Sequence, residues 1–163
     1  MNDNHPLIKQ CLEIAEKDHF GQVDKAGENY LLHPLIVSLL VQSHQRSVLK
    51  RLGNQLTEKQ LLQARCVAYL HDVVEDSAIT VNDLRDQHHL PAEICDAVKI
   101  LTKTKGEDYD AYLVRVKANP LSRLVKLADL LDNSNLNRLP KVTQEDRDRR
   151  VKYLKAMIYL WQD

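Results

Sequence analysis

Four ionisable side chains, His71, Asp72, Glu75 and Asp76, end an otherwise apolar stretch of the sequence. On a continuous helix of about 100° per residue, Glu75 lies about 40° from His71 and Asp76 about 40° from Asp72. Burying three carboxylates together is very costly unless a cation compensates their charge. Histidine nitrogen combined with aspartate oxygen suits Mn, Fe or Zn better than Ca. The pattern predicts a divalent-metal site, with a solvated helix end as the alternative.

Two more polar residues interrupt apolar segments elsewhere in the chain. His33 stands at the head of the apolar segment that begins at Pro34, and Asp129 lies within a Leu-rich run, with Lys126 and Asn133 on the same helical face. A buried aspartate needs a partner. A capping histidine and a plain salt bridge would explain these residues one by one. Taken together, two histidines and two aspartates from three helices would form a one-metal site with positions left for water.

Such a site has the parts for hydrolysis of a phosphoester. A divalent ion lowers the pKa of a bound water and polarises a phosphoryl oxygen. Either Glu75 or Asp76 can take the proton of the attacking water, and the sequence does not decide between them. Lys25, Lys126 and Lys103 can neutralise phosphate oxygens as point charges, and ordinary surface lysines are the competing interpretation.

The elements that must position these residues are helices almost throughout. Only four glycines and five prolines occur in 163 residues, which favours long helices over a turn-rich β fold. Apolar periodicity and capping signals predict about seven or eight helices in one all-α domain covering residues 1–163. These helices are expected at about 6–18, 34–49, 58–76, 80–88, 91–101, 108–118, 121–133 and 143–161. The segment 19–32, with two glycines and no helical period, is expected to be a structured loop.

Composition excludes several classes of function. The 23 basic and 23 acidic side chains balance, which argues against a broad nucleic-acid-binding surface. No apolar run approaches the length of a membrane span, and the first residues do not resemble a signal peptide. Three widely spaced cysteines without a CxxC motif predict buried free thiols and a cytoplasmic location. The mixed-charge run 144–150 predicts a solvated face or a contact between subunits of a homo-oligomer.

Five segments in order resemble the HD-domain metal phosphohydrolases, specifically the hydrolase domain of the Rel/Spo guanosine-tetraphosphate enzymes and their small stand-alone relatives. They are HFGQVDKAG at 19–27, YLLHP at 30–34, AYLHDVVED at 68–76, LTK at 101–103, and VKLAD at 125–129 with Asn133. The resemblance implies the all-helical HD fold, a single HD-type domain, and Mn²⁺ as the metal. It also implies removal of the 3′-pyrophosphate from (p)ppGpp, a small-molecule nucleotide.

The resemblance also assigns roles to residues of this sequence. It implies that the metal ligands are two histidines and two aspartates: His33, His71, Asp72 and Asp129. Glu75 and Asp76 match the pair that assists the attacking water. Asn133 matches a polar residue beside metal and substrate.

Three departures from the pattern concern the substrate. An arginine usually precedes the loop lysine in these relatives, where this chain has Asp24. Leu130 and Ser134 stand where basic residues are usual, although Arg138 follows one turn later. The interval from His33 to His71 is longer than usual. The alternatives are therefore an HD hydrolase for another nucleotide or phosphoester, and a non-catalytic nucleotide-sensing module, which would have no need of Glu75 and Asp76.

Overall fold

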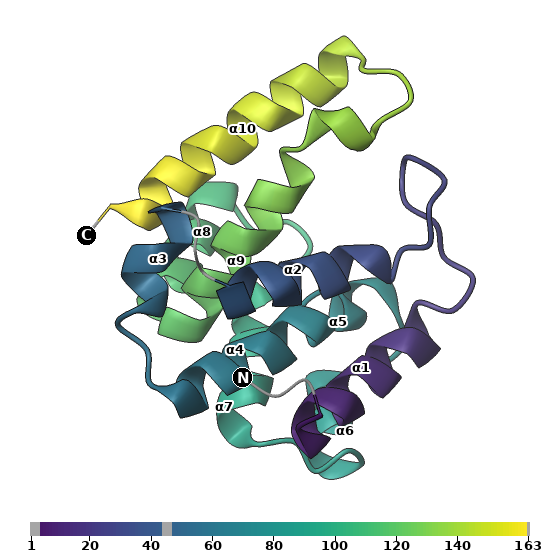
Figure 1. Cartoon of the computed structure of the whole chain (residues 1–163), viewed down its shortest axis with the longest axis vertical. Helices are drawn as coiled ribbons and strands as arrows, with labels where there is room; N and C mark the ends of the chain where they lie inside the picture. The colour runs from purple at the N-terminus through teal and green to yellow at the C-terminus, as the bar shows by residue number, and fades with distance from the viewer. Residues whose placement is uncertain (1–3, 44–46, 163) are drawn as a thin grey trace.

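The computed structural model describes residues 4–43 and 47–162, and within them it is helical, with one isolated β-bridge between Val23 and Asn29. The predicted all-α class is confirmed. The elements, shown in Figure 1, are α1 Pro6–Asp18, α2 Leu32–Ser43, α3 Ser47–Gly53, α4 Glu58–Leu70, α5 Val73–Asp76, α6 Val81–Asp86, α7 Ala92–Leu101, α8 Tyr109–Ala118, α9 Pro120–Asn133, the 3₁₀ turn η1 Leu136–Arg138, and α10 Gln144–Trp161.

The described residues form ten α-helices because two predicted helices are divided. The expected helix 34–49 corresponds to α2 and α3, and residues 44–46 between them lie outside the described part of the chain. The expected helix 58–76 ends at Leu70, and α5 begins anew at Val73. The His71 ring donates from Nδ1 to the Ala68 carbonyl at 2.7 Å, and Asp72 has φ −101°. The helix is therefore interrupted at His71 and Asp72, two of the residues that the sequence predicts as metal ligands.

Helix α4 is the centre of the fold. Every residue from Gln63 to His71 is buried, as expected for a helix that is apolar almost all round. It packs against α1, α2, α7 and α9 (Figure 1). Its start is held by a capping box between Thr57 and Gln60, in which each side chain bonds the other's backbone N–H. The end of α4 lies deep in the molecule, because all of its last residues are buried.

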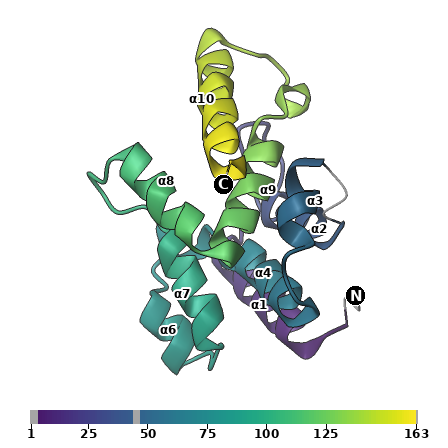
Figure 2. The same cartoon turned by 90° about the vertical axis from the view of Figure 1, so that its left-hand side faces the viewer.

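Helix α9 brings the second half of the chain to the same place. It packs against α2 and α4 on one side and against α10 and α8 on the other; in Figure 2 it lies between α10 above and α4 below. Its apolar residues Leu124, Leu127 and Leu130 are buried, and so are the aspartates Asp129 and Asp132. Two buried acids on one helix require partners nearby.

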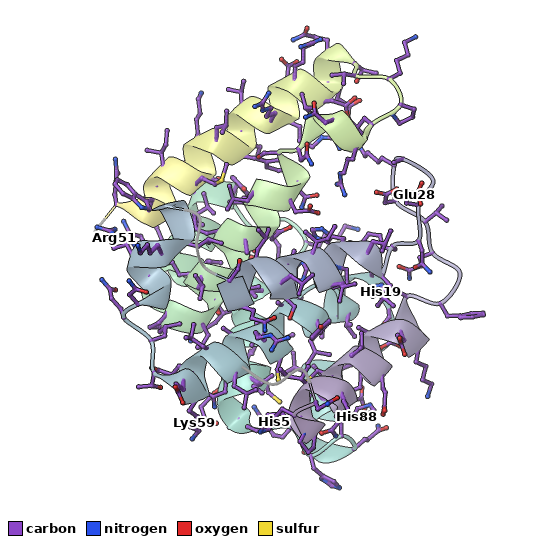
Figure 3. All side chains as sticks on the ribbon, in the orientation of Figure 1. His5, His19, Glu28, Arg51, Lys59 and His88 are labelled. Carbon is purple, nitrogen blue, oxygen red and sulfur yellow. The ribbon has the colours of Figure 1, made fainter. Side chains whose placement is uncertain are left out.

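The expected loop between α1 and α2 is ordered by its own hydrogen bonds. The Asp24 N–H donates to the Glu28 carbonyl at 2.8 Å, and Gly27 has φ +84°, a conformation that favours glycine. Figure 3 shows His19 where α1 ends and Glu28 on the part of the loop that projects from the body. The loop thus holds Lys25 on a short turn that precedes α2.

Two further observations concern the predictions from composition. The three cysteines, Cys11, Cys66 and Cys95, are buried and free, as predicted. Among the helices of the described residues, none combines the length and apolar character needed to cross a membrane.

Candidate metal and phosphoester site

The four predicted ligands converge from three helix ends. His33 comes from the first turn of α2, His71 and Asp72 from the break after α4, and Asp129 from α9. His33 Nε2 lies 3.2 Å from Asp129 Oδ1, and His71 Nε2 lies 3.2 Å from Asp72 Oδ2. One ligand atom from each of His33, His71 and Asp72 can be chosen so that all lie within 4.8 Å of one another. The structure therefore brings together residues far apart in the sequence.

Both imidazoles are oriented with Nε2 toward the carboxylates. His33 Nδ1 bonds Asp132 Oδ2 at 2.7 Å, and His71 Nδ1 bonds the Ala68 carbonyl at 2.7 Å. A histidine held in this way at one nitrogen presents the lone pair of the other to a metal. The Nε2 atom of His71 is buried and makes no hydrogen bond among the described residues. Two nitrogen and two carboxylate ligands of this kind fit a divalent transition metal.

The electrostatics of the four residues favours a cation between them. Burial opposes ionisation of Asp129, but Lys126 and the two imidazoles outweigh it and hold the pKa of Asp129 well below its ordinary value. Burial likewise opposes protonation of His71, yet the charges of Asp72 and Asp129 raise its pKa well above the ordinary value. Protons on the imidazoles thus balance the carboxylates, and a metal ion would compete with those protons.

Lys126 and Asn133 both contact Asp129. Lys126 Nζ lies 2.8 Å from Asp129 Oδ2, so the salt bridge considered from the sequence is present. The Asn133 amide donates to Asp129 Oδ1. Lys126 is half-buried and also faces the ring of Tyr112, whose pKa is raised to about 12, chiefly by burial. The Lys126 ammonium therefore already has partners within the protein, namely the Asp129 carboxylate and the Tyr112 ring.

Glu75 and Asp76 lie at the rim of the site and not in its interior. Both are exposed, because the helix break turns α5 outward, so the expectation of three carboxylates buried together is wrong. The Glu75 carboxylate accepts a hydrogen bond from the Lys103 backbone N–H. Partial burial, followed by the charge of Asp72, raises the pKa of Asp76, and burial also raises the pKa of Glu75. Both shifts bring these carboxyl groups closer to the range useful for proton transfer.

A cavity of about 260 Å³ lies one residue away from the ligands, none of which lines it. Its lining includes Lys25, Tyr30, Asn133, Arg138 and Tyr153. Two of these lining residues contact ligands, because the Tyr30 hydroxyl donates to Asp72 Oδ2 at 2.6 Å and Asn133 bonds Asp129. Lys25 is exposed at this cavity, as expected for a lysine that could meet an anion, whereas Lys103 meets Glu75 through its backbone.

Sequence reasoning missed three side chains of the site. Asp132 orients His33, Tyr30 bonds Asp72, and buried His19 packs its ring against Tyr30 with centroids 4.8 Å apart. A signal existed for Asp132, because it follows Asp129 by three residues in the same apolar run and so shares its helical face. Tyr30 stands in the segment 30–34 that carries the resemblance, but no spacing pointed to its bond with Asp72, since the two residues lie 42 apart in the sequence.

Comparison with known proteins finds relatives of this chain. No protein-family profile matches the chain. It is 32% identical over 150 residues to a GTP pyrophosphokinase of Streptomyces coelicolor, which covers 88% of this chain and 16% of the relative. It is 28% identical over 151 residues to a guanosine-3′,5′-bis(diphosphate) 3′-pyrophosphohydrolase of Borreliella burgdorferi, covering 85% of this chain and 20% of the relative. The chain thus spans a fifth or less of these relatives.

A solved structure, described as a metazoan ortholog of SpoT that hydrolyzes ppGpp, has the same fold. The superposition has a TM-score of 0.74 and 23% sequence identity, and it covers 99% of this chain and 89% of that one. The resemblance predicted from the motifs is therefore confirmed: over most of its length this chain is similar to one segment of the Rel/Spo-type guanosine-tetraphosphate enzymes.

Proposed function

We propose that this protein is a metal-dependent phosphohydrolase that removes the 3′-pyrophosphate from ppGpp or pppGpp. The observation that carries the proposal is the pair of imidazoles, each held at Nδ1 and each presenting Nε2 to a carboxylate. Relatives that bear the name guanosine-3′,5′-bis(diphosphate) 3′-pyrophosphohydrolase, and the fold shared with a protein described as hydrolysing ppGpp, support the choice of substrate.

The metal would be held by His33, His71, Asp72 and Asp129. Mn²⁺ is the proposed ion because the resemblance to the HD-domain phosphohydrolases implies it, while the mixed nitrogen and oxygen donors suit Mn, Fe or Zn. A divalent ion there supplies Lewis acidity toward a phosphoryl oxygen and favours ionisation of the attacking water. Asp132 and the Ala68 carbonyl keep the two imidazoles in the orientation that ligation requires.

The proton of the attacking water would go to Glu75 or Asp76. Both carboxylates are exposed at the rim of the site, where solvent reaches them. Their raised pKa values make them better bases than ordinary surface acids. A module that only senses a nucleotide would not need this pair, so its presence favours catalysis over sensing.

The substrate would occupy the cavity beside the ligands. Lys25 would neutralise a phosphate oxygen as a point charge, and Asn133, which donates one amide N–H to Asp129, would offer the other to the substrate. In this proposal Lys126 serves Asp129 first, because its ammonium already lies 2.8 Å from that carboxylate.

Incubation of Mn²⁺-loaded protein with ppGpp, followed by anion-exchange separation of the products, tests the proposal. We expect GDP and pyrophosphate in equal amounts. A panel of other nucleotides, scored for which phosphate is released, distinguishes the alternatives. Turnover of another nucleotide without turnover of ppGpp would overturn the substrate and retain the hydrolase. Nucleotide binding without any turnover would favour the sensing module. Elemental analysis of the purified protein identifies the metal.

A further inference from the structure

Arg138, at the end of η1, contacts three side chains, two of which line the cavity. Its guanidinium Nη1 lies 3.4 Å from Asp24 Oδ2 and 3.5 Å from Asp132 Oδ2. Its Nη2 donates to the Asn133 Oδ1 atom at 3.2 Å. The planar guanidinium can meet several acceptors at once, which a lysine ammonium cannot do in the same geometry.

Two of these partners each touch a different proposed metal ligand. Asp132 bonds His33 Nδ1 at 2.7 Å through the same Oδ2 atom that faces Arg138. Asn133 donates through its amide nitrogen to Asp129 Oδ1, while its oxygen accepts from Arg138. The Arg138 guanidinium is thus linked through one intervening residue to His33 on α2, and through another to Asp129 on α9.

The third partner joins Arg138 to the loop that carries Lys25. Asp24 Oδ1 accepts the backbone N–H of Ala26 at 2.8 Å and of Glu28 at 3.0 Å, which shapes the turn. Its other oxygen, Oδ2, faces Arg138. Asp24, which departs from the pattern of the relatives, therefore has a defined role. One of its oxygens shapes the turn, and the other attaches the turn to Arg138.

We propose that Arg138 is a positioning residue for the metal centre. It holds Asp132 and Asn133 in the orientation that directs His33 and Asp129 at the metal, and it ties this arrangement to the Lys25 loop through Asp24. The inference rests on the proposed metal site and deepens it. It assigns to the Asp24–Arg138 pair a function that neither residue has alone.

The Mn²⁺ affinity of the metal-stripped protein, measured by isothermal titration calorimetry, tests the proposal. We expect Arg138→Gln to weaken Mn²⁺ binding by roughly 3- to 10-fold, at or below the lower end of the range for residues that orient metal ligands. The direction of the change in Mn²⁺ affinity is informative, because removing a positive charge near the site would by itself strengthen the binding of a cation. A weaker affinity therefore identifies positioning.

Arg149→Gln is the matched control. Arg149 lines the same cavity, but its guanidinium pairs with Glu145 and Asp146 on its own helix. We expect its Mn²⁺ affinity to stay at the wild-type value or to rise slightly. Equal affinities in the Arg138 and Arg149 variants would overturn the proposal. The melting temperature of each metal-free variant shows whether a change reflects general destabilisation.

Asp24→Asn tests the link to the loop without removing the side chain. The asparagine oxygen can keep the turn bonds to Ala26 and Glu28, so this variant is expected to fold even if the arginine variant does not. We expect a smaller loss of Mn²⁺ affinity than for Arg138→Gln, and no further loss when the two are combined. Additive losses would contradict the coupling.

These measurements do not use turnover. A protein that binds Mn²⁺ as expected but leaves ppGpp intact would overturn the proposed substrate and leave the role of Arg138 standing. A wild-type protein that binds no Mn²⁺ would overturn the metal centre and this inference together.

Discussion

At the scale of single residues, the site depends on how each imidazole is held. A free histidine rotates and exchanges its proton between two nitrogens, whereas His33 and His71 each have Nδ1 engaged by a fixed acceptor. Their Nε2 atoms then face Asp72 and Asp129 across distances that a metal ion would bridge. The carboxylates divide between two tasks. Asp129, which is buried, and Asp72, which is half-buried, lie where a metal would be held, and Glu75 and Asp76 are exposed to water.

This division predicts different consequences for two acidic residues. Asp72→Ala removes a proposed ligand, so both bound Mn²⁺ and activity should be lost. Glu75→Gln keeps the shape of the side chain and removes only its basicity. We expect unchanged Mn²⁺ content and a kcat lower by about 10²- to 10⁴-fold. Metal content by elemental analysis and steady-state kinetics on ppGpp check both.

The matched variant Asp76→Asn shows which acid takes the proton. If Asp76→Asn lowers kcat as strongly as we expect of Glu75→Gln, and Glu75→Gln has little effect, then Asp76 is the base. Full activity of metal-free Asp72→Ala would refute metal-dependent hydrolysis.

At the scale of elements, the ends of helices carry the chemistry. The first turn of α2, the break after α4 and the last turns of α9 meet at one point. Helix ends leave backbone groups unpaired, so the chain can turn there and direct side chains inward. The caps at the opposite ends are remote from the ligands and contribute to stability alone.

The cap of α4 allows this separation to be tested. Thr57→Ala removes the side-chain acceptor for the Gln60 N–H and should lower the free energy of unfolding by about 1 kcal/mol. Mn²⁺ affinity should not change, because the cap lies at the far end of the helix from His71. Chemical denaturation and metal titration measure the two effects. Thr57→Ser, which keeps the hydroxyl, is the control; a loss of Mn²⁺ affinity in Thr57→Ala would contradict the separation.

At the scale of the whole molecule, the site joins the two halves of the chain. His33 lies on α2, and His71 and Asp72 directly follow α4. The fourth proposed ligand, Asp129, lies on α9, more than fifty residues further along the chain. A metal that binds only the folded arrangement must stabilise all of it. At a free metal concentration about 100 times the dissociation constant, this effect is worth about 2.7 kcal/mol.

The stabilisation by Mn²⁺ should grow with pH. In the metal-free protein the pKa of His71 lies well above its unfolded value of about 6.5, since Asp72 and Asp129 outweigh the effect of burial. Protonated His71 therefore stabilises the metal-free fold below about pH 6.5, and this contribution is lost as pH rises through the higher folded pKa. Metal binding needs the neutral imidazole and strengthens over the same interval.

Melting curves with Mn²⁺ and with a chelator, recorded between about pH 6 and about pH 8.5, measure this difference in melting temperature. His71→Gln removes the titrating group. In this variant the melting temperatures with Mn²⁺ and with a chelator should differ little at every pH. A difference that shrinks as pH rises in the wild-type protein would show that protons and metal do not compete for the imidazoles.

The sequence by itself determined the helical class, the capping boxes and the residue types that can hold a metal. These properties follow from local periodicity, from side-chain chemistry and from ordered motifs, which need no knowledge of distant contacts. The positions of His33, His71, Asp72 and Asp129 in the chain were predictable because polar residues stand out within apolar helices.

Only the tertiary structure decided how these residues are supported. Asp132 meets His33 across 99 residues and Arg138 meets Asp24 across 114, so no local pattern could pair them. The break at His71 and Asp72 was equally out of reach, because apolar Val73 and Val74 follow it and the spacing of the four ionisable residues also fits a continuous helix. Long-range packing turned Glu75 and Asp76 to the rim and kept Asp129 inside, and that difference separates the residues that would bind a metal from those that would move a proton.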